Sequence, residues 1–169
     1  SHLIKKLLDT TSFKIYNLDK FSYSSDFSLI NSSTESDNRH FHLKLNLKNI
    51  HEVISAVEKS QPDIIFHLAG ITNVGTTVKD KDLKRDKKIR NVGINGTRNI
   101  IKFSKSTTKI IFPSTHVVYE GLKKQKKEIK ESFPPNPTLE YSKGKLQSEN
   151  DLIYSKKNFV ILRLGSVFG

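Results

Sequence analysis

The chain has 169 residues, which is long enough for one domain with its own hydrophobic core. It contains no cysteine, so a disulfide framework, a thiolate metal site and a thiolate nucleophile are all excluded, and a reducing, cytoplasmic location fits. No apolar run approaches the roughly 18 to 20 residues that span a bilayer, and no signal-like segment opens the chain, so we expect a soluble protein without a membrane partner.

The formal net charge of +12 raises the question of a nucleic-acid partner. Only five of the 29 basic residues are arginine, and the two densest basic runs, residues 79–90 and 122–131, are interleaved with aspartate and glutamate. This pattern is typical of a solvated face, and we expect no nucleic-acid partner. An anionic ligand such as a nucleotide phosphate would still be attracted.

Strand-like and helix-like segments alternate along the first third of the chain. The residue at position 49 is an asparagine, which suits the cap of the helix that follows it. The expected elements are a helix over 1–8, a strand over 13–19, a Ser-rich loop over 22–40, a strand over 41–47 and a helix over 49–60.

The alternation continues to the end of the chain, where three apolar runs have strand length. The expected elements are strands over 61–70, 108–115 and 158–169, helices over 78–105 and 141–157, and a charged, proline-containing loop over 120–140. The first two strands are continuous apolar runs, as in strands buried on both faces of a parallel sheet. The sequence therefore predicts an α/β fold with a doubly wound parallel sheet, interrupted at both ends.

Two features of the sequence suggest a catalytic or cofactor-binding site, a tyrosine–lysine pair and an aspartate at the end of a strand. Tyr141 and Lys145 are four residues apart on a predicted helix, so both lie on one face, and a lysine cation near a phenol favours the phenolate. Two merely solvated side chains are the alternative. Asp19 ends a predicted strand, where an acidic residue binds the adenosine ribose in dinucleotide-binding units about 20 residues after a glycine-rich turn. Counting back runs off the chain, and a turn-forming aspartate is the alternative.

Five segments occur in the order and at roughly the spacing of one family. They are "DIIFHLAG" (63–70), "NGTRNII" (95–101), "FPSTHVVYEG" (112–121), "YSKGK" (141–145) and "VILRLGSVFG" (160–169). Together they resemble the extended short-chain dehydrogenase/reductases, in the NAD-dependent epimerase/dehydratase branch that acts on nucleotide sugars. The resemblance implies that residues 1–169 form a partial Rossmann-like NAD-binding domain, truncated at both ends. The first strand with its glycine-rich turn and most of the C-terminal substrate domain would be missing.

The resemblance also implies catalytic roles. Tyr141 would be the acid/base that takes a proton from a sugar hydroxyl while hydride passes to the nicotinamide. Lys145 would hold the nicotinamide ribose and, with the positive nicotinamide ring, lower the pKa of Tyr141. Thr115 would hydrogen-bond the reacting oxygen, although a structural hydroxyl at a strand end is the alternative.

Cofactor contacts follow from the same resemblance. Asp19 would bind the adenosine ribose, and its carboxylate implies NAD rather than NADP. Asn46 stands where the family often has an aspartate near the adenine. An amide can still hydrogen-bond there, so the assignment of Asn46 to the adenosine contact is weakened but kept. Leu68, Ala69 and Gly70 match the turn where the cofactor approaches the backbone, with an ordinary strand-to-loop turn as the alternative.

The two residues after Thr115 depart from the family pattern and make dehydration the less expected reaction. The sugar 4,6-dehydratases carry an acidic pair directly after the active-site threonine, because water elimination needs a further acid and base. Here His116 and Val117 follow instead, and valine transfers no proton. His67 is interpreted as a packed strand residue, and the six histidines lack metal-ligand spacing, so no metal is expected.

The function expected from these observations is NAD-dependent nucleotide-sugar epimerisation. A nucleotide-sugar reductase or 4,6-dehydratase of the same family, and a non-catalytic NAD- or nucleotide-binding module, remain as alternatives. The expected partner is a nucleotide sugar, and a homodimer is compatible with the family. We expect the 169 residues alone to bind NAD poorly and to turn over little.

Overall fold

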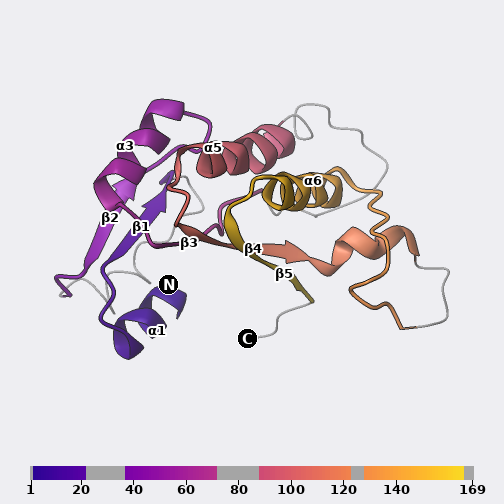
Figure 1. Cartoon of the computed structure of the whole chain (residues 1–169), viewed down its shortest axis with the longest axis horizontal. Helices are drawn as coiled ribbons and strands as arrows, with labels where there is room; N and C mark the ends of the chain where they lie inside the picture. The colour runs from indigo at the N-terminus through magenta and orange to yellow at the C-terminus, as the bar shows by residue number, and fades with distance from the viewer. Residues whose placement is uncertain (1, 22–36, 72–87, 123–127, 166–169) are drawn as a thin grey trace. The chain divides into compact units, whose positions relative to one another are not determined.

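The computed structural model describes residues 2–21, 37–71, 88–122 and 128–165 (Figure 1). The chain divides into two compact units, Ser1–Gln61 and Pro62–Gly169. Each unit combines helices with parallel strands, which confirms the predicted α/β class. Of the expected loop over 22–40, residues 22–36 lie outside the described residues, as do residues 78–87 of the expected helix over 78–105.

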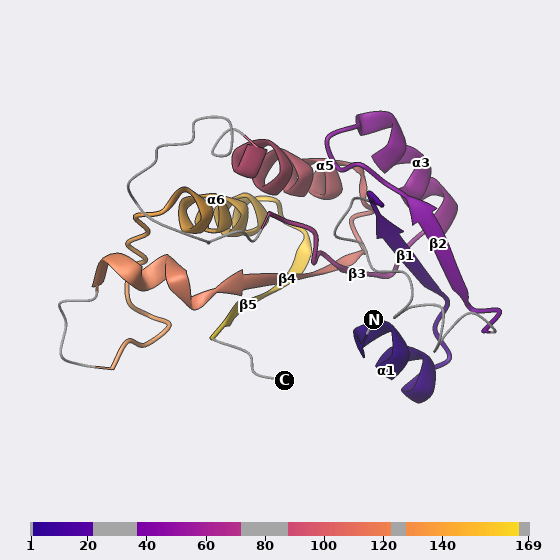
Figure 2. The ribbon, with the colours of Figure 1, turned by 180° about the vertical axis from the view of Figure 1, so that it is seen from behind.

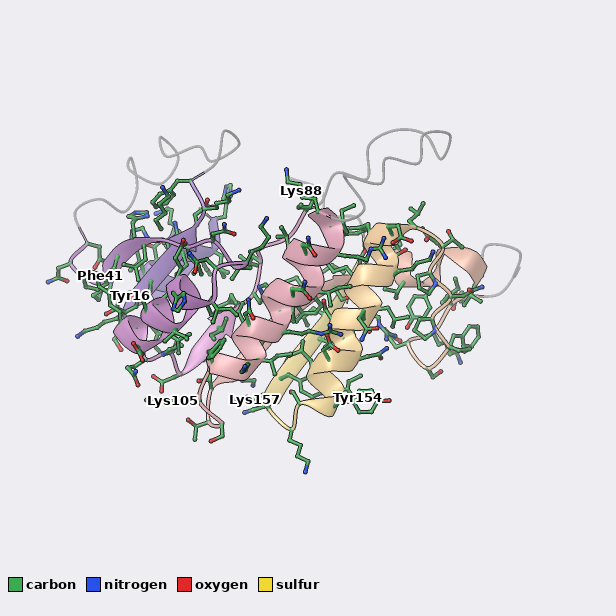
Figure 3. All side chains as sticks on the ribbon, turned by 90° about the horizontal axis from the view of Figure 1, so that it is seen from above. Tyr16, Phe41, Lys88, Lys105, Tyr154 and Lys157 are labelled. Atoms are coloured by element: carbon green, nitrogen blue, oxygen red, sulfur yellow. The ribbon has the colours of Figure 1, made fainter. Side chains whose placement is uncertain are left out.

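The first unit is built on two parallel strands. Its elements are α1 (His2–Thr10), β1 (Ile15–Asp19), β2 (His40–Lys44) and α3 (Ile50–Ser60). Tyr16 of β1 stands opposite Phe41 of β2, and their rings stack with centroids 4.9 Å apart, which adds an aromatic cross-strand pair (Figure 3).

The start of α3 explains why β2 is shorter than predicted. The Asn49 side chain accepts hydrogen bonds from the backbone N–H groups of His51 (3.1 Å) and Glu52 (3.4 Å), as expected of a helix cap. The Glu52 carboxylate reaches back to the backbone N–H of Asn46, at 2.7 Å. A turn closed by the Asn49 N–H and the Asn46 carbonyl (2.8 Å) leads into the capped helix. The strand therefore ends at Lys44, whereas the sequence predicted it to continue to residue 47.

The second unit carries a three-stranded parallel sheet in the order β3-β4-β5. Helices α5 and α6 lie side by side over this sheet (Figures 1 and 2). The elements are β3 (Ile64–Phe66), the π-helical turn η1 (Asn91–Asn95), α5 (Gly96–Phe103), β4 (Lys109–Thr115), the 3-10 helix η2 (His116–Leu122), α6 (Glu140–Tyr154) and β5 (Asn158–Leu164).

The core of this unit centres on β4, which lies between the other two strands. Ile110 and Phe112 are buried, as the apolar run predicted, and so is Leu152 of α6, the helix that contacts β4. The same prediction is wrong for β3, where Ile64 is 38% exposed. The physical reason is position in the sheet, because among the described strands β3 is an edge and only β4 has a neighbour on each side.

The 3-10 helix η2 replaces the beginning of the expected loop over 120–140. Its Gly121 donates its backbone N–H to the Asn136 carbonyl at 2.9 Å, and Asn136 donates to the Val118 carbonyl at 2.9 Å. A Cβ at Gly121 would collide with the backbone oxygen and the side chain of Asn136. A glycine is therefore required for this close approach of two backbone segments.

We expect Gly121→Ala to destabilise the chain by about 1 to 3 kcal/mol, because the added methyl group forces these segments apart. Gly93→Ala is the matched control, since a Cβ at Gly93 meets nothing within 4 Å and alanine favours the helical backbone there. The measurement is the urea midpoint of each variant. Equal midpoints for Gly121→Ala and the unaltered chain would contradict this account of Gly121.

The structure describes only part of the two basic runs. Most of the two basic runs, residues 79–87 and 123–127, lies outside the described residues, so their interpretation as a solvated face stays a prediction. Lys88 and Lys105, labelled in Figure 3, are exposed.

In the part of the chain that the structure describes, no helix combines the length and the apolar character needed to cross a membrane.

Candidate active site

Tyr141 and Lys145 line one pocket of the second unit. They lie one turn apart on α6, and the same pocket is lined by Ala69 and Gly70, which follow β3, and by Phe112 of β4. The pocket thus lies beyond the carboxyl end of a parallel strand, where ligands bind in open α/β sheets. The structure brings together four of the side chains and turn residues that the sequence singled out.

Lys145 is held by the strand beneath the helix. Its ammonium group donates to the Pro113 carbonyl at 2.8 Å and lies 4.6 Å from the centroid of the Phe112 ring. Burial lowers the pKa of Lys145 to about 8, and the negative charge of Glu149 acts against this lowering. The lysine is therefore mostly protonated at neutral pH, but more easily deprotonated than a surface lysine.

The pKa of Tyr141 differs from the expected direction. The spacing predicted that Lys145 would lower it, whereas burial of the half-buried phenol raises the pKa of Tyr141. The reason is that the Lys145 ammonium points to the Pro113 carbonyl and the Phe112 ring. In the chain by itself, this tyrosine is thus a protonated phenol at neutral pH.

Thr115 is the last residue of β4 and is buried. Its hydroxyl oxygen accepts a hydrogen bond from the backbone N–H of Val117, at 3.2 Å. Thr115 is not among the residues that line the pocket, although it stands two residues after Pro113, which binds Lys145. Its expected catalytic role stays a prediction.

The turn after β3 presents backbone and small side chains to the pocket. Leu68 donates its N–H to the Phe66 carbonyl at 3.0 Å and leaves its side chain 58% exposed. A Cβ placed on Gly70 would meet nothing within 4 Å, so open space adjoins the backbone there. The cofactor contacts expected of Leu68, Ala69 and Gly70 stay predictions.

His67 is a packed residue, as the sequence predicted. It is buried, and its Nε2 lies 2.9 Å from the Thr97 hydroxyl oxygen. Because the Thr97 hydroxyl donates its proton to the Gly93 carbonyl at 2.6 Å, His67 Nε2 must be the donor to Thr97. Burial, aided by the positive charge of Lys145, lowers the pKa of His67 to about 4. The ring is neutral at pH 7.

The two adenosine contacts expected from the sequence belong to the first unit. Asp19 ends β1, and its carboxylate accepts the backbone N–H of Phe21 at 2.7 Å, where the backbone φ is 55°. Asn46 follows β2, and its side-chain oxygen accepts the N–H of Lys48 at 3.2 Å. Both residues thus make local turn contacts, and their roles in cofactor binding stay predictions.

Glu120 caps the helix that carries Tyr141, and the sequence did not reveal this. The residue before α6 is Leu139, whose side chain has no polar atom, and the Glu120 carboxylate takes its place. It accepts the backbone N–H groups of Thr138 and Leu139, both at 2.6 Å, and the Ser142 hydroxyl at 2.8 Å. A negative charge at a helix N-terminus also complements the helix dipole.

Burial acts to raise the pKa of Glu120, but the hydrogen bonds from Leu139, Ser142 and Thr138 outweigh it, so the net pKa is lowered. A lowered folded-state pKa contributes stability above the unfolded-state pKa, and this stability is lost as the pH falls through the folded-state value. We therefore expect Glu120→Gln to cost about 1 kcal/mol at neutral pH and less under acid conditions. Urea unfolding at several pH values measures this, and a pH-independent cost would contradict it.

Glu149 is a second carboxylate that sequence patterns did not single out. It is fully buried and lies between Ser114, which donates to it, and Arg163, whose Nη2 is 2.6 Å from Glu149 Oε2. Its partners come from β4 and β5, far away in sequence. The only local signal is its spacing of four residues from Lys145.

The parallel strands, the covering helices and the pocket beyond a strand end define an α/β protein of the Rossmann-like class. The model of one family, the NAD dependent epimerase/dehydratase family, matches residues 1–169. The chain belongs to this family.

Individual relatives are distant in sequence. A curated dTDP-glucose 4,6-dehydratase of Haemophilus influenzae is 24% identical over 156 residues, which cover 89% of this chain and 46% of that protein. The UDP-glucuronic acid 4-epimerase of Bacillus cereus, solved with NAD, is 23% identical with a TM-score of 0.78, over 99% of this chain and 53% of that one. The dTDP-glucose 4,6-dehydratase of Bacillus anthracis, also solved with NAD, is 18% identical with a TM-score of 0.79, over 96% and 49%.

These comparisons establish the fold, and the chain spans about half the length of the relatives it matches. The family is NAD-dependent by its description. The residues of the pocket fit a nicotinamide nucleotide, because a partly buried cation, a phenol and a turn with open space at Gly70 all line it. Among the described side chains, no group of three histidines or carboxylates is placed to hold a metal ion.

Proposed function

We propose that residues 1–169 form part of the NAD-binding domain of an NAD-dependent nucleotide-sugar epimerase. The observation that carries the proposal is the pocket that Tyr141 and Lys145, one turn apart on α6, line together with the turn of Ala69 and Gly70. Membership of the family adds the cofactor and the substrate class, since related structures contain NAD, and one contains UDP as well.

In this proposal, each residue of the set has one task. Tyr141 removes the proton from a sugar hydroxyl and returns it, and Thr115 hydrogen-bonds the same oxygen. Lys145, kept protonated, binds the ribose hydroxyls beside the nicotinamide, while Asp19 and Asn46 bind the adenosine. A bound NAD supplies reversible hydride acceptance at the sugar carbon.

A bound cofactor would also change the pKa of Tyr141. Burial alone raises the pKa of the phenol, so Tyr141 needs additional positive charge to become a base. The Lys145 ammonium has three N–H groups, so it can bind the ribose hydroxyls and keep its hydrogen bond to the Pro113 carbonyl. Together with the positive nicotinamide ring of a bound NAD, it would provide such charge. The lowering of the Tyr141 pKa is thus proposed for the cofactor-bound state.

Epimerisation is favoured over dehydration by the two residues after Thr115. Val117 transfers no proton, and the His116 Nδ1 lies 3.1 Å from the Leu164 carbonyl, to which it donates. Because valine is neither an acid nor a base, these two positions do not supply both of the groups that removal of water requires. The Haemophilus influenzae relative is a dehydratase, so a 4,6-dehydratase is the second candidate, followed by a reductase.

The products distinguish these reactions. The natural polypeptide that carries these residues is incubated with NAD⁺ and a panel of UDP- and dTDP-hexoses, and the sugars are followed by NMR. A stereoisomer formed without net redox change supports the epimerase. A 4-keto-6-deoxy sugar indicates the dehydratase, and consumption of added NADH indicates the reductase. Salt-sensitive retention on nucleic acid that NAD does not affect, without any sugar product, would favour a binding module.

A further inference from the structure

A buried carboxylate connects the helix of the Tyr141 and Lys145 pair to the strand that ends in Thr115. Glu149 is fully buried and accepts a hydrogen bond from the hydroxyl of the buried Ser114, the neighbour of Thr115. Its other contacts are to Arg163 of β5, whose Nε lies 3.1 Å and whose Nη2 lies 2.6 Å from Glu149 Oε2. One carboxylate therefore joins α6, β4 and β5.

The contacts of Glu149 and Lys145 are in register. The two residues are one helical turn apart, and they bind Ser114 and Pro113, which are adjacent on β4. A helix held at two successive points along a strand cannot slide or rotate over it without breaking one of the two contacts. The distance from Tyr141 to the end of β4 is thereby fixed.

Arg163 extends the same network to a fourth segment. Besides Glu149, its guanidinium donates to the Tyr119 hydroxyl in η2, and Tyr119 in turn donates to the Glu131 carbonyl at 3.0 Å. A salt bridge this deeply buried is weak evidence for stability, because desolvation offsets most of the attraction. Stability alone does not explain its presence beside the pocket.

We propose that Glu149 is a positioning residue for the reaction: it fixes the Lys145 turn of α6 against the end of β4 and places a negative charge one turn from the lysine. The charge favours the ammonium form of Lys145. The proposal rests on the proposed function, in which Tyr141, Lys145 and Thr115 act together, and it assigns to Glu149 no contact with substrate or cofactor.

The groups that face Lys145 come from several elements. Glu149 and Tyr141 lie on its own helix, the neutral His67 follows β3, and Arg163 of β5 pairs with Glu149. Of these, Glu149 is the group whose negative charge counteracts the lowering of the Lys145 pKa by burial. Removing that charge should make Lys145 lose its proton at a lower pH.

The first test is the titration of Lys145 in Glu149→Gln, which keeps the shape and removes the charge. Trace acetylation of the natural polypeptide by acetic anhydride over a pH series, read by peptide mass spectrometry, gives the pKa of Lys145 without requiring turnover. We expect a fall of about one unit from the value near 8. Asp151→Asn is the matched control, because Asp151 is also a carboxylate of α6, paired with Arg98 at 2.7 Å, and should leave the lysine unchanged.

The second test isolates position from charge. Ser114→Ala removes the hydroxyl and leaves Glu149 paired with Arg163, so folding is preserved even if Glu149→Gln fails to fold. We expect kcat to fall roughly 10- to 100-fold with little change in KM and with the Lys145 pKa retained. Unchanged kcat in Ser114→Ala, or an unchanged Lys145 pKa in folded Glu149→Gln, would overturn the proposal. Absence of turnover in the unaltered protein would count against the proposed function alone, because the lysine titration does not depend on it.

Discussion

Tyr141→Phe is expected to lower kcat of the natural polypeptide by roughly 10²- to 10⁴-fold, the range by which a positioned general acid or base contributes. The phenol is half-buried in the pocket beside Lys145, and phenylalanine keeps the ring while removing the ionisable oxygen. KM for the sugar nucleotide should change little, because the phenol hydroxyl acts in proton transfer in the transition state rather than in ground-state binding.

A second tyrosine on the same helix provides the control. Tyr154 is 82% exposed at the end of α6 and projects from the ribbon, as Figure 3 shows. Tyr154→Phe should retain full activity. If Tyr141→Phe and Tyr154→Phe turned over equally fast, Tyr141 would not be the acid/base, and the proposed mechanism would be wrong.

Arg163→Leu is expected to destabilise the chain by about 3 to 5 kcal/mol, because it leaves a buried carboxylate without its cation. The Arg163 side chain is 22% exposed and that of Glu149 only 1%, so water replaces little of the lost interaction. Urea unfolding of the variant and the unaltered chain measures the difference.

Two further variants separate burial from charge pairing as such. Arg98→Leu breaks an ion pair of similar length, 2.7 Å, whose side chains are 53% and 17% exposed, and should cost at most about 1 kcal/mol. Adding Glu149→Gln to Arg163→Leu should restore part of the lost stability, because it removes the uncompensated charge. Equal costs for Arg163→Leu and Arg98→Leu would contradict this account of the buried pair.

The elements that sequence predicted best are those whose signals are local. Asn49 caps α3 through groups two and three residues away, and β4 is a continuous apolar run at the centre of a sheet. Tyr141 and Lys145 share a helix face by spacing alone, and they do line one pocket. The length of β3 and its exposure depend instead on which strands become neighbours, which no local pattern specifies.

The residues that sequence missed are those whose roles arise from contacts over long separations. Glu120 caps a helix that begins twenty residues later, and Glu149 meets Ser114 at a separation of 35 residues. Neither glutamate has a sequence neighbour that indicates its role, because its partners are brought close only by folding. The Tyr141 pKa was missed for a related reason, because the direction in which Lys145 points is decided by the Pro113 carbonyl and the Phe112 ring of β4.

The reaction proposed for this pocket is reversible hydride transfer between a sugar carbon and NAD. The most direct measurement is rapid mixing of the natural polypeptide and NAD⁺ with UDP- and dTDP-hexoses, while the absorbance of reduced nicotinamide is recorded and the sugars are collected. We expect transient reduced nicotinamide followed by an epimerised sugar, with both signals slowed by roughly 10²- to 10⁴-fold in Tyr141→Phe and unchanged in Tyr154→Phe. Epimerised sugar formed at full rate by Tyr141→Phe, or formed without any reduced nicotinamide, would contradict this expectation.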